Sequence, residues 1–229
     1  MLERLAKPAL DVGLFTNDRE PMLEFWQQDA GVPFVEMLPL GGGLQQHRHA
    51  IGASVLKVNH VRDSLAEAGA AGIRHLSIAR AGLREVRQLV DPDGNRLTLV
   101  PPGYQGTSQL RVHMTVSELA SHQHFYGEVL GLPTLDPITF LCGDSQIRLE
   151  QGPARRDPIQ VARGYRYLTV QVFDVVEAHA RILAGGGREG RPPVRLGEVA
   201  HISFVLDPDG NWLEISQRKS LTGSLDSRA

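Results

Sequence analysis

Short stretches in which apolar and polar residues alternate recur along this chain, and such stretches predict β-strands with one covered and one open face. The clearest lie at 110–116, 167–172 and 201–206. Residues 119–130 and 175–184 instead repeat apolar residues at helical spacing, and glycine follows each stretch. The pattern therefore predicts an α+β fold.

The last hairpin carries the most specific local signal. Residues 207–211 read Asp-Pro-Asp-Gly-Asn, which suits a type I turn because proline fixes φ at the second position and glycine relaxes the exit. In the strand that follows, Leu213 and Ile215 are expected on the covered face. Glu214 and Trp212 are therefore expected on the open face, where a carboxylate is either solvated or functional.

The chain also contains an internal repeat. Residues 10–33 match residues 110–133 without gaps, an offset of 100 residues, and the Asp-Pro-Asp-Gly-Asn turn occurs twice, 116 residues apart. This tandem duplication predicts an N-terminal domain at 8–102, a C-terminal domain at 108–218 and a flexible tail at 219–229.

Each half is predicted to contain the order βαβββ twice. The C-terminal elements are strand 110–116, helix 119–130, strands 139–142, 146–150 and 167–172, helix 175–184, and strands near 194, 201–206 and 212–216. The N-terminal elements are strand 10–16, helix 20–30, strands near 34–38 and 45–50, strand 53–58, helix 61–71 and strands ending at Val100, with the module at 34–50 shortened.

Composition narrows the range of partners. The 24 basic and 26 acidic residues give a net charge of −2, which favours neither nucleic acid nor a membrane surface as partner. The single cysteine, Cys142, excludes an intramolecular disulfide and is typical of a reducing compartment. No apolar run is long enough to span a bilayer. We therefore expect a cytoplasmic monomer or homo-oligomer with a small-molecule ligand.

Three features resemble one known family: two βαβββ units per domain, Phe125-Tyr126 in a first helix, and Asp-Pro-Asp-Gly-Asn-x-Leu-Glu in the last hairpin. That family is the vicinal oxygen chelate superfamily. It includes glyoxalases, extradiol dioxygenases, epimerases and drug-resistance proteins. The resemblance covers about residues 10–217. It implies two glyoxalase-like domains with U-shaped mixed sheets that bind ligand on the inside. The N-terminal half has fewer candidate ligand residues on that side and no clear set of His and Glu, so we expect the N-terminal domain to be structural and the C-terminal domain to carry the ligand site.

The strand pattern predicts which side chains of the C-terminal domain face the inside of the U. These are Arg111, His113, Thr115, Arg148, Glu150, Tyr167, Thr169, Gln171, His201, Ser203, Trp212, Glu214 and Ser216.

The resemblance also implies a divalent ion (Fe, Mn, Zn or Ni) held by histidines of first strands and a glutamate of a last strand. Glu214 matches that glutamate, whereas Arg111 and Tyr167 stand at the histidine positions. Two interpretations follow. Either the site is metal-free and Arg111 pairs with Glu214, or the site is displaced along the strands and His113 joins Glu214 as metal ligand, with His201 or Glu150.

We therefore expect an enzyme with extradiol dioxygenase-like or glyoxalase/epimerase-like chemistry, in which a metal or Arg111 stabilises an oxyanion. His113 and Tyr167 would carry protons, and Arg148, Thr169, His201 and Trp212 would bind substrate. The alternative is a metal-free binding protein of the bleomycin-resistance type.

The remaining histidines give weaker signals. His47 and His49 share one strand face, which fits either a metal site or a polar strand surface. His122, His124 and His179 are expected to be exposed on helices.

Overall fold

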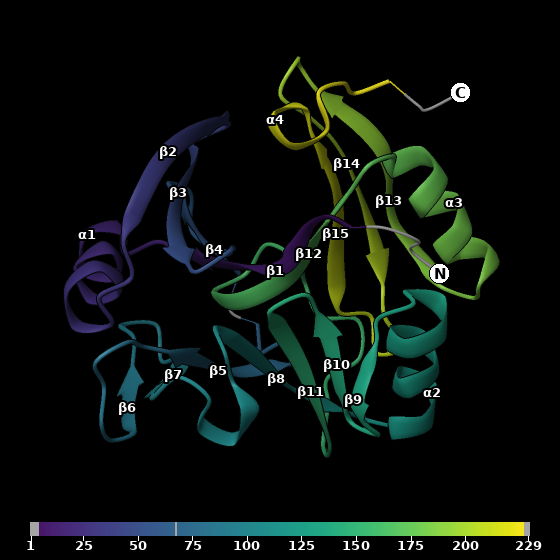
Figure 1. Cartoon of the computed structure of the whole chain (residues 1–229). Helices are drawn as coiled ribbons and strands as arrows, with labels where there is room; N and C mark the ends of the chain where they lie inside the picture. Colours follow the sequence, from purple (N-terminus) through teal and green to yellow (C-terminus); the bar gives the residue numbers. More distant parts are fainter. Residues whose placement is uncertain (1–4, 67, 227–229) are drawn as a thin grey trace.

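The computed structural model describes residues 5–66 and 68–226 and consists of two curved β-sheets with helices on their outer sides (Figure 1). The eight-stranded sheet has the order β13 (Arg188–Leu196), β14 (Ala200–Leu206), β15 (Trp212–Arg218), β12 (Gly164–Val172), β1 (Leu5–Thr16), β4 (Ser54–Val61), β3 (Leu44–Ile51) and β2 (Phe34–Gly41). The seven-stranded sheet has the order β6 (Arg87–Val90), β7 (Arg96–Val100), β5 (Ile73–Ala79), β8 (Leu110–Val116), β11 (Ser145–Gln151), β10 (Thr139–Cys142) and β9 (Thr134–Asp136).

Three helical segments pack on these sheets. They are α1 (Arg19–Glu24) continued by η1 (Phe25–Asp29), α2 (Leu119–His124) continued by η3 (Phe125–Val129), and α3 (Val175–Ala184). The Asp174 side chain caps α3 by accepting the Glu177 N–H at 3.0 Å. Short segments η2 (Tyr104–Gly106) and α4 (Lys219–Thr222) follow the first half and the last strand. No helix of the described part is long and apolar enough to cross a membrane.

The sheets do not follow the predicted division at 8–102 and 108–218. β1 pairs antiparallel with β12, and β5 pairs antiparallel with β8, so each sheet combines strands from both halves of the chain. The first βαβββ module thus joins the fourth, and the second joins the third. The residues that line each inner face come from both halves, including the half expected to be structural.

The N-terminal half also differs from the prediction in detail. Residues 54–61 form β4, which closes the first module by pairing in parallel with β1, rather than opening the second. The predicted helix at 61–71 is wrong for the residues described there, which form bends and one isolated bridge. The Asn17 side chain donates to Val61 O and accepts from Leu65 N, so it bonds to backbone groups at the start of this segment. The shortened module is the second, at 73–100, which has no helix between β5 and β6.

The C-terminal half agrees with the prediction. α2 with η3 covers 119–129, α3 covers 175–184, and the strands lie at the expected positions. The tail differs: up to Asp226 it packs on the protein, because Leu225 is buried and Ser224 O accepts from Gln217. Residues 227–229 lie outside the described part.

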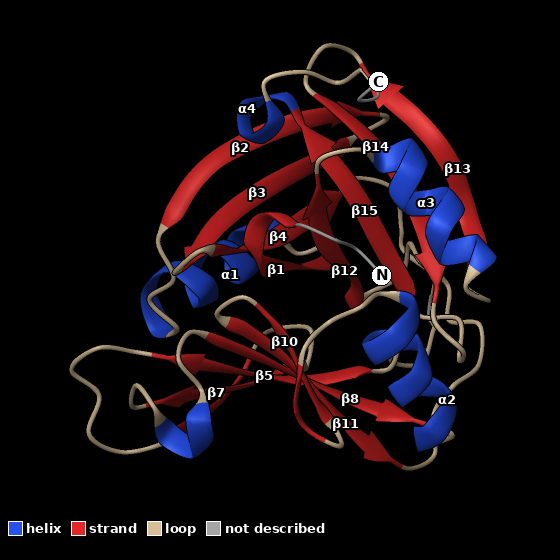
Figure 2. Cartoon of the chain, turned by 45° about the vertical axis from the view of Figure 1, so that its right-hand side comes forward, coloured by secondary structure: helices blue, strands red, loops and turns tan. Residues whose placement is uncertain are grey.

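The turn at 207–211 connects the eight-stranded sheet to α2, the helix that packs on the seven-stranded sheet. Figure 2 shows α2 next to the end of β15. Tyr126 donates to Asp207 Oδ2 at 3.1 Å, and His122 Nε2 lies 3.6 Å from Asp207 and 3.5 Å from Asp209. Burial raises the pKa of Asp207. The prediction that His122 is exposed is therefore wrong.

Some of the other histidines are also buried where the sequence predicted exposure. His179 is buried, against expectation, whereas His124 is exposed as expected. His47 and His49 are buried on the outer face of β3, where Phe34 packs against both rings. Gln27 bonds His49 Nε2 at 3.3 Å, and burial lowers the pKa of His49 to about 4. Neither histidine is a polar surface residue.

Candidate functional site

Two pairs of parallel strands build the centre of the eight-stranded sheet, and they are related by an approximate twofold symmetry. β4 pairs with β1 so that Lys57 lies opposite Gly13, and β15 pairs with β12 so that Glu214 lies opposite Thr169. β1 and β12 then pair antiparallel, with Gly13 opposite Tyr167. Lys57 therefore holds in the first module the position that Glu214 holds in the fourth.

Lys57 and Glu214 meet on the inner face of this sheet. Lys57 Nζ lies 2.6 Å from Glu214 Oε2 and donates to Thr169 Oγ1 at 2.8 Å, and Thr169 Oγ1 lies 2.9 Å from the same carboxylate oxygen. The Lys57 side chain is 4% exposed and that of Glu214 is 11% exposed. Burial lowers the pKa of Lys57, and the carboxylates of Glu214 and Asp11 oppose that shift.

A chain of polar side chains extends from this pair across the first module. Asn59 donates to Tyr167 Oη at 3.1 Å, and Gln46 donates to Asn59 at 3.0 Å. Arg48 continues the chain, donating to Gln46 at 3.2 Å and pairing with Glu36 at 3.0 Å. Burial, followed by the charge of Glu214, raises the pKa of Tyr167 and keeps its hydroxyl protonated.

Aromatic rings border the polar chain on one side. Tyr167 lies 5.9 Å from Phe15 and 6.1 Å from Phe204 between ring centroids, and Phe204 lies 5.9 Å from Trp212. Gly13 makes room for Tyr167, since a Cβ atom at Gly13 would lie 2.0 Å from the tyrosine ring. The inner face thus joins an apolar wall to a buried cation, a carboxylate and a hydroxyl.

The predicted site residues separate into two groups. Tyr167, Thr169, Trp212 and Glu214 gather on the eight-stranded sheet, as described above. Arg111, His113 and Arg148 lie together on the seven-stranded sheet.

The predicted pairing of Arg111 with Glu214 is wrong for this reason. Arg111 instead donates to Gln146 at 2.7 Å and to Gln105 O at 2.5 Å. The counter-ion of Glu214 is Lys57.

His201 and Ser203 were expected on the inner face and lie on the outer one. Phe204 is directly opposite Glu214 in the ladder of β14 and β15, so Phe204 shares the inner face and its neighbour Ser203 does not. Ser203 accepts or donates a hydrogen bond with His179 Nδ1 at 3.0 Å beneath α3. His201, opposite Gln217, lies on the same outer face.

The residues do not fit the divalent metal that the resemblance implies. His113 and Glu214 lie on different sheets. The ammonium of Lys57 already pairs with Glu214 Oε2 and would compete with a metal cation for this carboxylate. Within residues 5–66 and 68–226, no group of three or more His, Cys, Asp or Glu side chains is placed to hold a metal ion. We therefore derive no step through a metal.

The sequence prediction missed Gln46, Arg48, Lys57 and Asn59. These four residues alternate along β3 and β4 and belong to the half that was expected to be structural. Their alternation signalled one common face, but only the pairing of the first module with the fourth places that face opposite Glu214.

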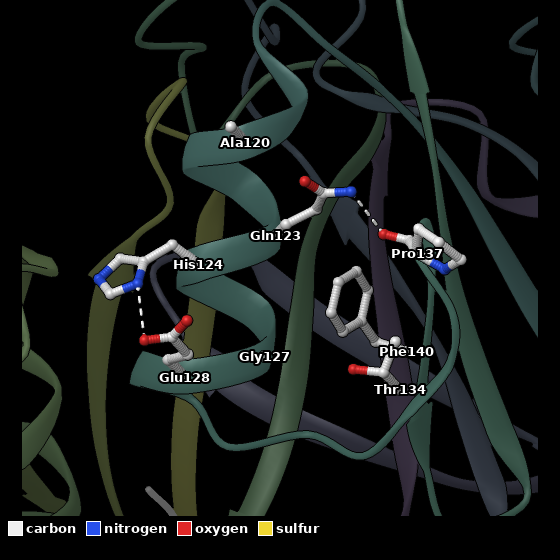
Figure 3. A pocket seen from close by; sticks show the side chains of 8 residues that line it. All are labelled: Ala120, Gln123, His124, Gly127, Glu128, Thr134, Pro137 and Phe140. Carbon is white, nitrogen blue, oxygen red and sulfur yellow. Dashed lines mark hydrogen bonds and ion pairs between the residues drawn. The ribbon is translucent and has the colours of Figure 1, made fainter.

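A pocket of about 430 Å³ lies elsewhere, between α2 and the strands β9 and β10 (Figure 3). Gln123 donates to Pro137 O at 2.7 Å, and His124 lies 3.1 Å from Glu128 along the helix. These are ordinary contacts of an exposed helix surface, so we assign the pocket no function.

Comparisons with known proteins agree with this fold. Residues 108–215 match the sequence profile of the Glyoxalase/Bleomycin resistance protein/Dioxygenase superfamily. No curated protein sequence is significantly similar to the chain. Glyoxalase I from Zea mays has a similar structure, with a TM-score of 0.71 at 15% identity over 94% of this chain and 96% of that chain. A putative dioxygenase from Bacillus subtilis gives a TM-score of 0.66 at 12% identity over 94% and 90% of the two chains. At such identities the likeness shows the fold.

Proposed function

We propose that this protein is an enzyme that moves a proton on a small carbonyl compound. Two findings support the proposal. Residues 108–215 match the profile of the Glyoxalase/Bleomycin resistance protein/Dioxygenase superfamily, and the chain has the fold of glyoxalase I. The compound binds on the inner face of the eight-stranded sheet, against the rings of Phe204 and Trp212. Of the expected reaction classes, this is the glyoxalase- or epimerase-like one. A dioxygenase would need the metal ligands that Lys57 and the separation of the sheets leave unassembled.

The buried pair of Lys57 and Glu214 is the observation that carries the proposal. A buried ion pair contributes little to stability, because desolvating two charges costs about as much as their attraction returns. Lys57 and its surrounding polar chain are therefore better explained by function than by packing.

The chemistry follows from the atoms that remain available. Glu214 Oε2 is bonded to Lys57 and Thr169, whereas Oε1 accepts no bond from a described residue. Glu214 Oε1 takes the proton from the hydroxyl-bearing carbon beside the carbonyl, the C–H electron pair forms a C=C bond, and the carbonyl π pair moves to oxygen. The carboxyl then returns the proton to the former carbonyl carbon. The hydroxyl of the first carbon becomes the new carbonyl and passes its proton to the oxyanion, which becomes the new hydroxyl.

The oxyanion formed in this step needs hydrogen-bond donors. Lys57 has three N–H donors, of which two are used by Glu214 and Thr169. Tyr167 accepts from Asn59, so its own O–H can also point to the oxyanion. A cation and a hydroxyl in a nonpolar setting stabilise such charge more strongly than water does.

A metal-free binding protein is the second candidate, and one observation favours it. Glu214 is already paired with Lys57, and the aromatic wall alone suffices to hold a ring-bearing ligand.

Incubation in D₂O with 2-oxoaldehyde thiohemiacetals distinguishes the two candidates. If deuterium enters the position beside the carbonyl, and this incorporation is lost in Glu214→Gln but kept in Glu198→Gln, the result supports the enzymatic function. Glu198 is a suitable control because it forms an exposed pair with Lys219 at 3.2 Å. Saturable binding without exchange supports the binding protein.

A further inference from the structure

The seven-stranded sheet carries its own cleft, separate from the site proposed above. The cleft has a volume of about 1480 Å³ and is lined on the inner side of the sheet by His75, Arg96, Thr98, His113, Arg148 and Glu150. None of these residues takes part in the chemistry proposed at Lys57 and Glu214.

Four of the lining residues form one row across the sheet. In the ladders of neighbouring strands, Arg96 lies opposite His75, His75 opposite His113, and His113 opposite Arg148. Neighbouring strands are about 4.8 Å apart, so the row spans about 14 Å between the Cα atoms of its two arginines. The row thus carries a positive charge at each end and two imidazole rings between them.

The two histidines at the centre stack on each other. Their ring centroids are 4.6 Å apart with an interplanar angle of 27°. His75 Nε2 lies 2.6 Å from Thr98 Oγ1, and His113 Nε2 lies 2.9 Å from Ser77 Oγ. Among the described residues, neither ring has a hydrogen-bond partner at Nδ1, so both nitrogens remain free to meet a ligand.

Both rings are neutral in the absence of ligand. Burial lowers the pKa of His113 to about 3, and the charges of His75, Arg111 and Arg148 act in the same direction. Burial and then Arg96 lower the pKa of His75. The neutral rings are thus a consequence of burial and of the positive charge around them.

That positive charge is poorly compensated. Arg96 makes no ion pair with any residue in the described part of the chain. Arg148 pairs with Asp136 at 3.3 Å, but both side chains are about two-fifths exposed, where ion pairs are weak. Arg74 also lines the cleft, and Glu150 is the acidic side chain that lines it. The cleft therefore favours an anionic ligand.

We propose that this cleft is a second ligand site, which binds a small organic dianion such as a dicarboxylate. One carboxylate pairs with Arg96 and the other with Arg148, and the body of the ligand lies over the two imidazole rings. A ligand of this charge compensates the charge of both arginines. The proposal does not depend on the reaction at Glu214.

Calorimetry with succinate tests the proposal, with acetate and the neutral succinamide as comparison ligands. We expect saturable succinate binding, at least about tenfold tighter than acetate binding, and no binding of succinamide. Arg96→Gln and Arg148→Gln should each weaken succinate binding about tenfold. Arg84→Gln, an exposed arginine of the loop between β5 and β6, should not change it.

Two further readouts distinguish binding in this cleft from nonspecific binding of anions at the protein surface. Succinate should shift the imidazole NMR signals of His75 and His113, and thermal unfolding should show that the two arginine variants remain folded. Succinate binding should persist in Glu214→Gln, so failure of one proposal leaves the other testable. Equal binding of acetate and succinate, or no response of the histidine signals, would overturn the second site.

Discussion

Lys57 and Glu214 hold corresponding positions in the first and fourth modules, and 2.6 Å separates Lys57 Nζ from Glu214 Oε2. One position of the repeat thus supplies a cation and its counterpart an anion. The pair connects strands that are 157 residues apart in sequence and lies where the inner faces of two modules meet. The counter-ion of Glu214 in this arrangement is an ammonium group that belongs to the chain.

The first prediction concerns the energy of this pair. Lys57→Met or Glu214→Gln alone should lower the free energy of unfolding by about 3–5 kcal/mol, because each leaves one buried group without its partner. The double variant should recover most of that loss. Urea unfolding of all four proteins gives the coupling energy, and additive losses in the double variant would show that the groups do not interact.

The space for Tyr167 gives a second prediction. Gly13→Ala places a methyl group 2.0 Å from the tyrosine ring, so the ring must move and the protein should lose about 1–3 kcal/mol of stability. Gly69→Ala is the matched control, because its methyl group meets only the flexible side chain of Arg155, at 2.9 Å. Equal stability of the two variants would mean that Tyr167 is not held against Gly13.

Tyr126 tests how the two sheets are fastened together. Tyr126→Phe removes the hydrogen bond to Asp207 and leaves a buried carboxylate oxygen with one donor fewer. We expect a loss of about 1–3 kcal/mol in thermal or urea unfolding. Tyr104→Phe, at an exposed position, should be neutral. A neutral Tyr126→Phe would show that the turn is held by its other bonds.

The pH dependence of stability follows from His113. Its pKa is about 3 in the folded protein and 6.5 in the unfolded chain, so the unfolded chain binds more protons between these values. Stability from this group is complete above about pH 6.5 and falls as the pH decreases toward 3, by up to about 1.4 kcal/mol per pH unit. In His113→Gln the unfolding free energy should fall less steeply over this range. Parallel pH profiles of the two proteins would contradict the assignment.

Much of the fold is predictable from the sequence because each signal is local. The helix at 175–184 follows from an apolar repeat with Asp174 before it and glycine after it, and the hairpin at 207–211 follows from proline and glycine. The superfamily profile matches residues 108–215, and the fold that the resemblance implied is confirmed.

The pairing of modules is not local and was not predictable. The order βαβββ is the same whether the first module joins the second or the fourth, and only the structure decides between them. Both partners that the two interpretations gave Glu214, Arg111 and His113, therefore lie on the other sheet. His201 and Ser203 were misplaced because the polar side of the alternation at 201–206 was expected to face inward, whereas the inner face carries the aromatic wall to which Phe204 belongs.

Proton exchange after removal of metals tests the central claim most directly. The protein is dialysed against a strong chelator, and deuterium incorporation into 2-oxoaldehyde thiohemiacetals is measured for wild type, Lys57→Met, Glu214→Gln and the exposed control Glu198→Gln. We predict unchanged exchange in chelated wild type and control, and a loss of about 10²–10⁴-fold in Glu214→Gln. Exchange that disappears on chelation and returns with added Zn, Ni or Fe, or that survives in Glu214→Gln, would contradict the account.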